Sequence, residues 1–397
     1  MAVEAAENDD KSYVVQLRLT IISILSALLC AVPCKLHAQN QLTPFVENQR
    51  TWSYPQFKYQ KALGYSSITF ETPQSLQNEV QFWIQIYTKY TTQQGLFHIS
   101  GAVDQVIGDI DLTDVFANPK WSAIRKEKEA EILIRRKRQR IANQHGITNI
   151  KHIRLQMGLK DRMENAIFNS GRYLPMMEEI FKKQDLPIEL TRLVFVESSF
   201  NIQAQSRVGA SGLWQIMPII GKKFKYLDAN HDLRNDPRSA TLLAAKILKQ
   251  NYQILKSWPL AVTSYNFGVG SMLKVQKKLK SKDDQYILNS ADLNKYIGFA
   301  SRNFYATFLA ALYVESHANI YYGEPFMIAA PQAVNQFMLT QKIKYDDLIL
   351  KYKISADDFK QLNVHIRGKH MKKGKWLPKG TLIHIPINKV ATLDTPE

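Results

Sequence analysis

The sequence predicts a mainly α-helical protein with a small α+β module near its C-terminus. From about residue 153 to residue 311, apolar residues recur at helical spacing between frequent glycine and proline breaks, with no long alternating run. Residues 334–387 differ, because two short helical patterns precede a Pro-Lys-Gly turn and the alternating stretch TLIHIP. With 397 residues, 45% of them apolar and 22% charged, the chain can hold two or three globular domains.

The first 38 residues are typical of a secretory signal peptide. Leu19 to Val32 is apolar and uncharged, follows two basic residues, and is shorter than the roughly 20 residues of a membrane span. We expect cleavage after Ala38 and export to the periplasm or cell envelope, with an uncleaved membrane anchor as the alternative. Both cysteines, Cys30 and Cys34, lie in this segment, so the mature chain is expected to have no thiol chemistry.

Residues 39–150 are expected to form a helical N-terminal extension. Residues 40–75 show no clear periodicity and are expected to form an extended segment that leads to the first helix. Ser75 can cap a helix that runs from Leu76 to Tyr90 with apolar residues at helical spacing. A second helix is expected from Trp121 to about Gln144.

The net charge of +17, from 52 Lys and Arg against 35 Asp and Glu, favours polyanionic partners. Part of this charge is the run Arg135–Arg138 in the second helix. We interpret the run as a solvated helix face, with contact to an anionic glycan or a membrane surface of the envelope as the alternative. Nucleic acid is not expected as a partner of an exported protein, and the sequence leaves the oligomeric state open.

In VFVESSFN, residues 194–201, a single carboxylate follows an apolar run. Glu197 shares a helical face with three apolar residues, whereas Glu189 and Arg192 are expected on the solvated face. The three apolar residues are Leu190, Leu193 and Val194. Burial and the nearby helix C-terminus should both raise the pKa of Glu197. A carboxyl that stays protonated near neutral pH can serve as the general acid of glycoside cleavage, and a water-exposed glutamate is the alternative.

Two further segments have the chemistry of a sugar site. SRVGASGLWQIMP, residues 206–218, combines glycines with aromatic, amide and thioether side chains, although a loop that packs Trp214 into the core would look the same. SYNFGVG, residues 264–270, places Tyr265 and Asn266 before a glycine, which by itself is an ordinary helix C-cap. Neither segment is specific alone.

The combination is specific. Glu-Ser-x-Phe-Asn, Ser-x-x-Gly-Ala-x-Gly-Leu-x-Gln-x-Met-Pro and Tyr-Asn-x-Gly together resemble the lytic murein transglycosylases of the lysozyme-like superfamily, in particular their membrane-bound D type. The resemblance covers about residues 75–315, and Gln215 and Tyr265 follow Glu197 by eighteen and sixty-eight positions. It implies a lysozyme-like catalytic domain at residues 151–320 that acts on peptidoglycan glycan strands without a cofactor.

The resemblance also implies a reaction. Glu197 would protonate the glycosidic oxygen between N-acetylmuramic acid and N-acetylglucosamine, then act as base on the C6 hydroxyl, leaving a 1,6-anhydro end. The implied substrate-binding residues are Ser198, Ser206, Gln215, Met217, Tyr265, Asn266 and Tyr305. One carboxyl suffices because the substrate supplies the nucleophile, and no acidic residue follows Glu197 until Asp228. A hydrolytic muramidase on the same fold and a non-catalytic peptidoglycan-binding protein are the alternatives.

Three features qualify the resemblance. Many relatives carry Glu-Thr-Arg-x-Tyr-Val in a late helix, whereas ASRNFY at residues 300–305 puts Ala300 at the Glu position and leaves Phe304 or, as we favour, Tyr305 for the aromatic residue. Residues 334–387 resemble a LysM module, which binds N-acetylglucosamine-containing glycans, but IKYDDL replaces the usual opening. A small interaction or stabilising module is the alternative.

The nine histidines contain no His-Glu-x-x-His, so no metal site is expected.

Overall fold

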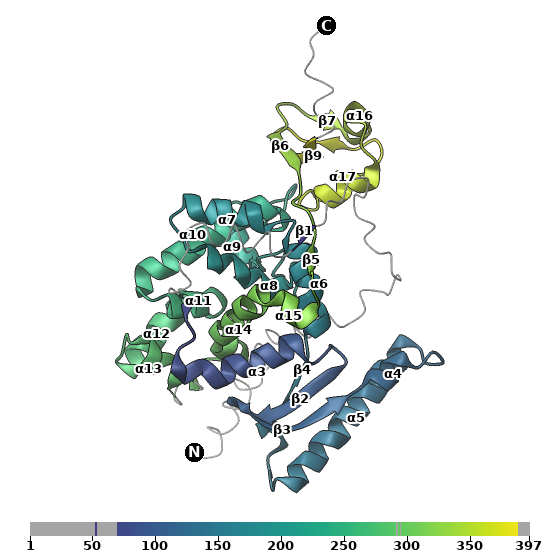
Figure 1. Ribbon diagram of the computed structural model, residues 1–397. Coiled ribbons are helices and arrows are strands. Elements are labelled where there is room, and N and C mark those ends of the chain that lie inside the picture. The colour runs from purple at the N-terminus through teal and green to yellow at the C-terminus, as the bar shows by residue number, and fades with distance from the viewer. Residues whose placement is uncertain (1–51, 54–69, 291–292, 294, 388–397) are drawn as a thin grey trace, which may run out of the picture.

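The computed structural model describes residues 52–53, 70–290, 293 and 295–387, so the predicted signal peptide and both cysteines lie outside the described residues. A helical body lies between a sheet with a long helix on one side and a small module on the other (Figure 1). The mainly helical fold class with an α+β C-terminal module is confirmed. Within the described ranges, no helix is both long and apolar enough to cross a membrane.

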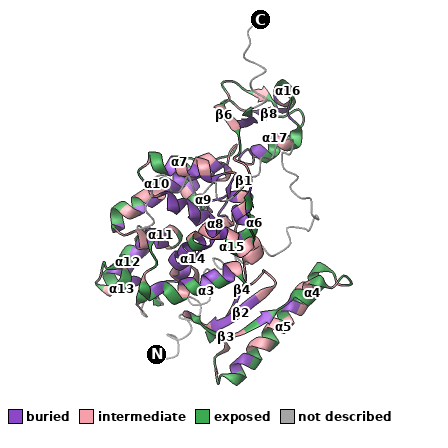
Figure 2. Cartoon of the chain, viewed as in Figure 1, coloured by how far each residue is buried: buried purple, intermediate pink, exposed green. Residues whose placement is uncertain are grey.

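The helical body is built around α14, which packs against α3, α8 and α11. Its helices are α3 (Gln77–Thr88), α6 (Lys160–Ser170), α7 (Leu174–Lys183), α8 (Leu193–Ser198), α9 (Pro218–Lys223), α10 (Pro237–Leu255), α11 (Trp258–Phe267), α12 (Val269–Leu279), α13 (Asp284–Asn289), α14 (Phe299–Ser316) and α15 (Ala318–Tyr322). The buried residues gather along α8, α10 and α14 (Figure 2). As predicted, Asp236 caps α10, because its Oδ1 accepts a hydrogen bond from the Ser239 amide at 2.7 Å, and Pro237 takes the first helical position.

The region expected to be a helical extension differs from that prediction. α3 belongs to the body, where Trp83 Nε1 donates a hydrogen bond to Asn303 Oδ1 of α14 at 3.3 Å. β2 (Gln94–Ile99) and β3 (Ala102–Asp111) form an antiparallel hairpin, and β4 (Ile153–Met157) completes a sheet of order β3-β2-β4. The sheet therefore crosses the boundary expected at residue 150. The turn at Gly101, where φ is 90°, between two runs rich in apolar and β-branched residues was the signal for strands.

α4 (Thr113–Ala117) and α5 (Ala123–Gln144) follow the hairpin, and α5 lies across the sheet. α5 begins at Ser122, whose Oγ accepts a hydrogen bond from the Arg125 amide at 3.3 Å. Gly108 of β3 permits close packing, because a Cβ there would lie 2.7 Å from the Ile141 side chain. Within the basic run, Arg138 folds over the Phe97 ring at 5.9 Å, while the two arginines at its start remain exposed.

The C-terminal module has its own core and the expected strand–helix–helix–strand order. Its elements are β6 (Val334–Met338), β7 (Ile343–Lys344), α16 (Tyr345–Lys351), α17 (Ala356–Leu362), β8 (Trp376–Leu377) and β9 (Leu382–Pro386). β6 pairs with β9 and β7 with β8, both antiparallel. Upstream, β1 (Trp52–Ser53) pairs with β5 (Met327–Ile328). The module contacts the body through backbone hydrogen bonds from Asp232 N to His365 O at 2.8 Å and from Arg367 N to Asn230 O at 3.0 Å.

Candidate active site

Glu197 lies in the last turn of α8, on the wall of a pocket. The side chain is partly buried, while Leu193 and Val194 one turn before it are fully buried, as is Leu190 in the preceding 3₁₀ helix η5 (Ile188–Arg192). Burial raises the pKa of Glu197 to about 8. At neutral pH the carboxyl is therefore mainly protonated, as the apolar sequence around it predicted.

The expectation that Glu189 and Arg192 face solvent is wrong. Their exposed fractions are 6% and 1%, because η5 breaks the helix that the sequence suggested and changes the angular positions of both residues. Arg192 Nη1 contacts Glu178 of α7, and Arg192 Nη2 lies 3.2 Å from Glu315 Oε1 of α14. Paired charges of this kind tolerate burial, and they fix the start of α8 between α7 and α14.

α8 ends abruptly after Ser198. Ser199 and Phe200 have φ values of 51° and 54°, in the left-handed region that non-glycine residues seldom adopt. The Ser198 hydroxyl donates a hydrogen bond to the Leu213 carbonyl oxygen at 2.8 Å. The end of the helix that carries Glu197 is thus fastened to the loop that follows it.

That loop, residues 199–217, depends on two unusual backbone positions. Gly212 has φ of 75°, and a Cβ there would lie 2.1 Å from the Arg234 carbonyl oxygen. Gln215 has φ of 45°, and its Nε2 donates hydrogen bonds to the carbonyl oxygens of Gly212 at 2.8 Å and Ala204 at 3.1 Å. The Gln215 amide nitrogen therefore holds the loop in place, while the side chain also lines the pocket.

Trp214 and Tyr265 support the site from within the core. Trp214 is fully buried and its Nε1 donates to Thr241 Oγ1 at 2.9 Å, which is the core role that the sequence left open for it. The Tyr265 hydroxyl donates to the Trp214 carbonyl oxygen at 2.9 Å. Burial, and next the nearby Glu197 charge, raise the pKa of Tyr265 well above its usual value. Tyr265 is therefore close enough to Glu197 to share its electrostatic environment.

Other predicted site residues lie outside the pocket wall. Ser206 closes a turn, where its Oγ accepts a hydrogen bond from the Ala210 amide at 2.9 Å. Met217 is 39% exposed at the start of α9, and Asn266 is an exposed side chain that accepts a hydrogen bond from Ser301. Tyr305 is only 2% exposed, because this face of α14 packs into the body's core.

The pocket has a volume of about 540 Å³, and Glu197, Ser198 and Gln215 lie on its wall. Glu197 is the only carboxylate among the described residues that line it. Arg162 and Arg172 contribute cations. The rest of its polar surface is dominated by neutral amides: Asn165, Asn169, Asn201, Gln203, Gln205, Gln215, Gln332 and Gln361. Such a wall offers many hydrogen-bond donors and acceptors to an uncharged polyhydroxylated ligand.

Several of these residues were not predicted from the sequence. Arg162, Asn165 and Asn169 come from α6, where spacings of three and four residues place them on one helical face, and that polar stripe was a usable signal. Gln332 precedes β6, and Gln361 belongs to α17 of the C-terminal module. Nothing in the sequence links these glutamines to Glu197. The pocket is thus closed on one side by the module.

Residues 176–288 match the transglycosylase SLT domain. This SLT segment runs from within α7 to within α13 and includes Glu197, Gln215 and Tyr265. Membrane-bound lytic murein transglycosylase D of Escherichia coli (strain K12) is 30% identical over 125 residues, which are 31% of this chain and 28% of that protein. A protein of Alteromonas sp. (strain M-1) described as a tributyltin chloride resistance protein is 33% identical over 129 residues, 32% of this chain and 62% of that protein.

Among solved structures, the 70 kDa soluble lytic transglycosylase of Escherichia coli matches with a TM-score of 0.31 and 20% identity, over 39% of this chain and 25% of that chain. The chain thus spans less than two thirds of each of these relatives. The family match is confined to the SLT segment, which contains the candidate site. The resemblance of the C-terminal module to LysM stays a prediction.

Proposed function

We propose that the protein is a lytic transglycosylase that cleaves the glycan strands of peptidoglycan. The observation that carries the proposal is Glu197, a single protonated carboxyl in a pocket with no second carboxylate among its described lining residues. The SLT segment supports the reaction class, because it contains Glu197 and the residues that hold it in place. The proposal includes export, since the substrate lies outside the cytoplasm and the N-terminus resembles a signal peptide.

Glu197 acts twice in the proposed reaction. Its carboxyl first gives a proton to the oxygen that joins N-acetylmuramic acid to N-acetylglucosamine, and the bond from that oxygen to C1 breaks. The resulting carboxylate then takes the proton of the C6 hydroxyl while the C6 oxygen bonds to C1, forming the 1,6-anhydro ring. The proton returned to Glu197 restores the enzyme, and no water is consumed. A hydrolase with paired carboxylates would require a second one near the bond.

The rest of the pocket suits this substrate. Neutral amides can bind ring hydroxyls and acetamido groups without competing with Glu197 for the proton. Arg172 offers a cation to the lactyl or peptide carboxylates that muramic acid carries. The Ser198 hydroxyl and the Gln215 amide nitrogen already donate hydrogen bonds to backbone carbonyl oxygens. We therefore assign them to positioning Glu197 rather than to binding the sugar.

Glu197→Gln tests the proposal. The amide keeps the shape of the side chain but cannot donate the proton, so release of fragments from purified sacculi should fall by at least about 10²-fold. Mass spectrometry of the wild-type digest should show 1,6-anhydro ends. Glu164→Gln, on the exposed face of α6 and outside the pocket, is the matched control and should digest as wild type does.

Two outcomes would contradict the proposal. Reducing ends throughout the wild-type digest would identify a hydrolytic muramidase. Wild-type protein that binds sacculi without releasing fragments would identify a non-catalytic wall-binding protein.

A further inference from the structure

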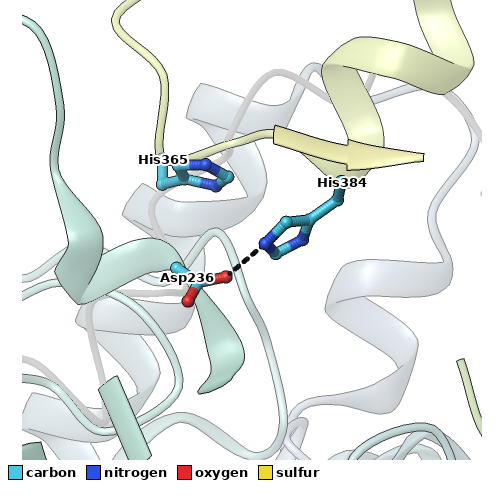
Figure 3. Close-up of side chains that lie close together, drawn as sticks. All are labelled: Asp236, His365 and His384. Atoms are coloured by element: carbon cyan, nitrogen blue, oxygen red, sulfur yellow. Dashed lines mark ion pairs between the residues drawn. The ribbon is translucent and has the colours of Figure 1, made fainter. Parts of the chain in front are cut away.

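Three polar side chains from distant parts of the sequence meet where the module contacts the body. Asp236 caps α10 of the body, His365 follows α17, and His384 lies on β9 (Figure 3). Their exposed fractions are 0%, 0% and 2%. Ionisable side chains buried this completely normally have partners, so the arrangement requires an explanation.

One atom of each side chain lacks a hydrogen-bond partner. Asp236 Oδ2, His365 Nδ1 and His384 Nε2 are buried without a hydrogen-bond partner. One potential ligand atom from each of the three side chains lies within 4.8 Å of the other two. Asp236 Oδ2 and His384 Nε2 lie 3.0 Å apart, close enough for an ion pair when His384 is protonated. That contact leaves His365 Nδ1 without a partner, and a buried polar atom left unpaired costs free energy.

The remaining atoms of two of these side chains are anchored in the manner of metal ligands. His365 Nε2 lies 3.0 Å from the Leu382 carbonyl oxygen, which can only accept, so Nε2 carries the hydrogen and Nδ1 keeps the lone pair. Asp236 Oδ1 accepts from the Ser239 amide, which leaves Oδ2 facing the histidines. Outer partners of this kind fix the tautomer and orientation of ligating side chains.

We propose that Asp236, His365 and His384 bind a zinc ion that joins the C-terminal module to the helical body. Two imidazoles and one carboxylate can bind Zn²⁺ with a water as the fourth ligand, although zinc sites that serve structure alone usually have four protein ligands. Ligand atoms of tetrahedral zinc lie about 3.4 Å apart, since each is roughly 2.0–2.2 Å from the ion. The one pair with a known separation, Asp236 Oδ2 and His384 Nε2 at 3.0 Å, is slightly closer than this, and the three potential ligand atoms all lie within 4.8 Å of one another.

The site is coupled to the Glu197 pocket through Asn363. Asn363 Nδ2 donates to the His384 carbonyl oxygen at 2.9 Å, and Asn363 Oδ1 accepts from the His384 amide at 2.7 Å. The two residues before Asn363, Gln361 and Leu362, line the pocket. Zinc bound to His384 would therefore hold α17 against the pocket while taking no part in bond cleavage.

The test measures metal directly and does not depend on activity. Full-length protein is stripped with a chelator, dialysed, and titrated with Zn²⁺ against a chromophoric competitor, with bound metal counted by mass spectrometry. We expect about one tightly bound Zn²⁺ per chain and a higher Tm with Zn²⁺, because an ion that binds only the folded state stabilises it. Mg²⁺, which prefers oxygen ligands, should change neither measurement.

Near-isosteric variants locate the site. Replacing a residue that only hydrogen-bonds to a metal ligand weakens metal binding roughly 10- to 100-fold. His384→Gln and Asp236→Asn replace proposed ligands themselves, so each should weaken Zn²⁺ binding by more than that. His145→Ala is the control, because His145 is exposed at the end of α5 and should have no role in the site. This variant should bind Zn²⁺ as wild type does. Wild-type protein that binds no Zn²⁺ tightly, or variants that bind it unchanged, would overturn the proposal and leave a metal-free ion pair.

A second measurement needs no variant. Co²⁺ bound at a site with few nitrogen and oxygen ligands absorbs visible light far more strongly than octahedral aqueous Co²⁺. Intense absorption that Zn²⁺ abolishes at one equivalent supports the site, and the weak octahedral spectrum contradicts it. Since neither readout uses glycan cleavage, the zinc proposal and the proposed function can fail separately.

Discussion

Glu197 holds its proton more tightly than an ordinary glutamate, and its pKa of about 8 determines the expected pH dependence. In the proposed mechanism Glu197 must be protonated in the free protein, so the active form is fully present well below pH 8 and is lost as pH rises through 8. kcat/KM for soluble glycan strands should therefore be level near neutral pH and fall about tenfold for each unit above pH 8. If kcat/KM instead began to fall near pH 4 to 5, the ordinary range for the pKa of glutamate, the raised pKa would be contradicted.

At this scale the sequence predicted the raised pKa of Glu197, because the signal is local. The apolar residues just before it in the chain, Leu190, Leu193 and Val194, are buried as expected. Arg192 shows the limit of the same argument. Its burial depends on Glu178 and Glu315, which come from other helices, and on a 3₁₀ turn that helical periodicity does not reveal.

Among the elements, the loop from Ser199 to Met217 matters most, because it receives the end of α8 and contains Gln215. Gly212→Ala should displace it, since the new Cβ would meet the Arg234 carbonyl oxygen at 2.1 Å and the left-handed backbone would be strained. We expect a loss of at least about 2 kcal/mol in the free energy of unfolding, because such backbone strain alone costs roughly 1–3 kcal/mol. Denaturant titration measures the loss, and sacculus digestion should decline with it.

Gly270→Ala is the matched control for this change. A Cβ at Gly270 meets nothing within 4 Å, and the residue lies in the first turn of α12. Alanine is favoured over glycine in helices, so this variant should be as stable as wild type or slightly more stable. Equal unfolding midpoints for Gly212→Ala and wild type would show that the loop tolerates the displacement.

The elements themselves were predictable where their signals are local. Asp236 and Pro237 marked the start of α10, and Ser122 lies where the second predicted helix begins. The three-stranded sheet was missed because β2 pairs not only with β3 but also with β4, whose residues lie more than fifty positions downstream. Local periodicity carries no information about such a partner.

For the whole molecule, the pocket joins segments that are far apart in the sequence. Glu197, Ser198 and Gln215 lie in two neighbouring motifs and were predicted together, whereas the amides of α6 and the glutamines at positions 332 and 361 come from elsewhere. The three-residue cluster of the proposed zinc site is a similar case. Contacts between body and module create both sites, and no spacing rule along the chain identifies them.

Because the module supplies part of the pocket wall, a change on α17 should affect substrate binding rather than the chemistry. Gln361 is exposed and lines the pocket, so its replacement removes a hydrogen-bonding group without disturbing a core. Gln361→Ala should raise KM for glycan strands about 2- to 10-fold and leave kcat nearly unchanged, since one hydrogen bond contributes roughly 0.5–1.5 kcal/mol.

Lys360→Ala provides the comparison, because Lys360 precedes Gln361 on the same helix but lies outside the pocket wall. Its exposed side chain makes only a weak contact with Asp357, so both kinetic constants should stay at wild-type values. Equal effects of the two substitutions would mean that α17 acts through the general stability of the module. An effect of Gln361→Ala on kcat alone would place α17 outside the binding step. A rise in KM for Gln361→Ala alone would show that the helical body and the module bind the glycan together.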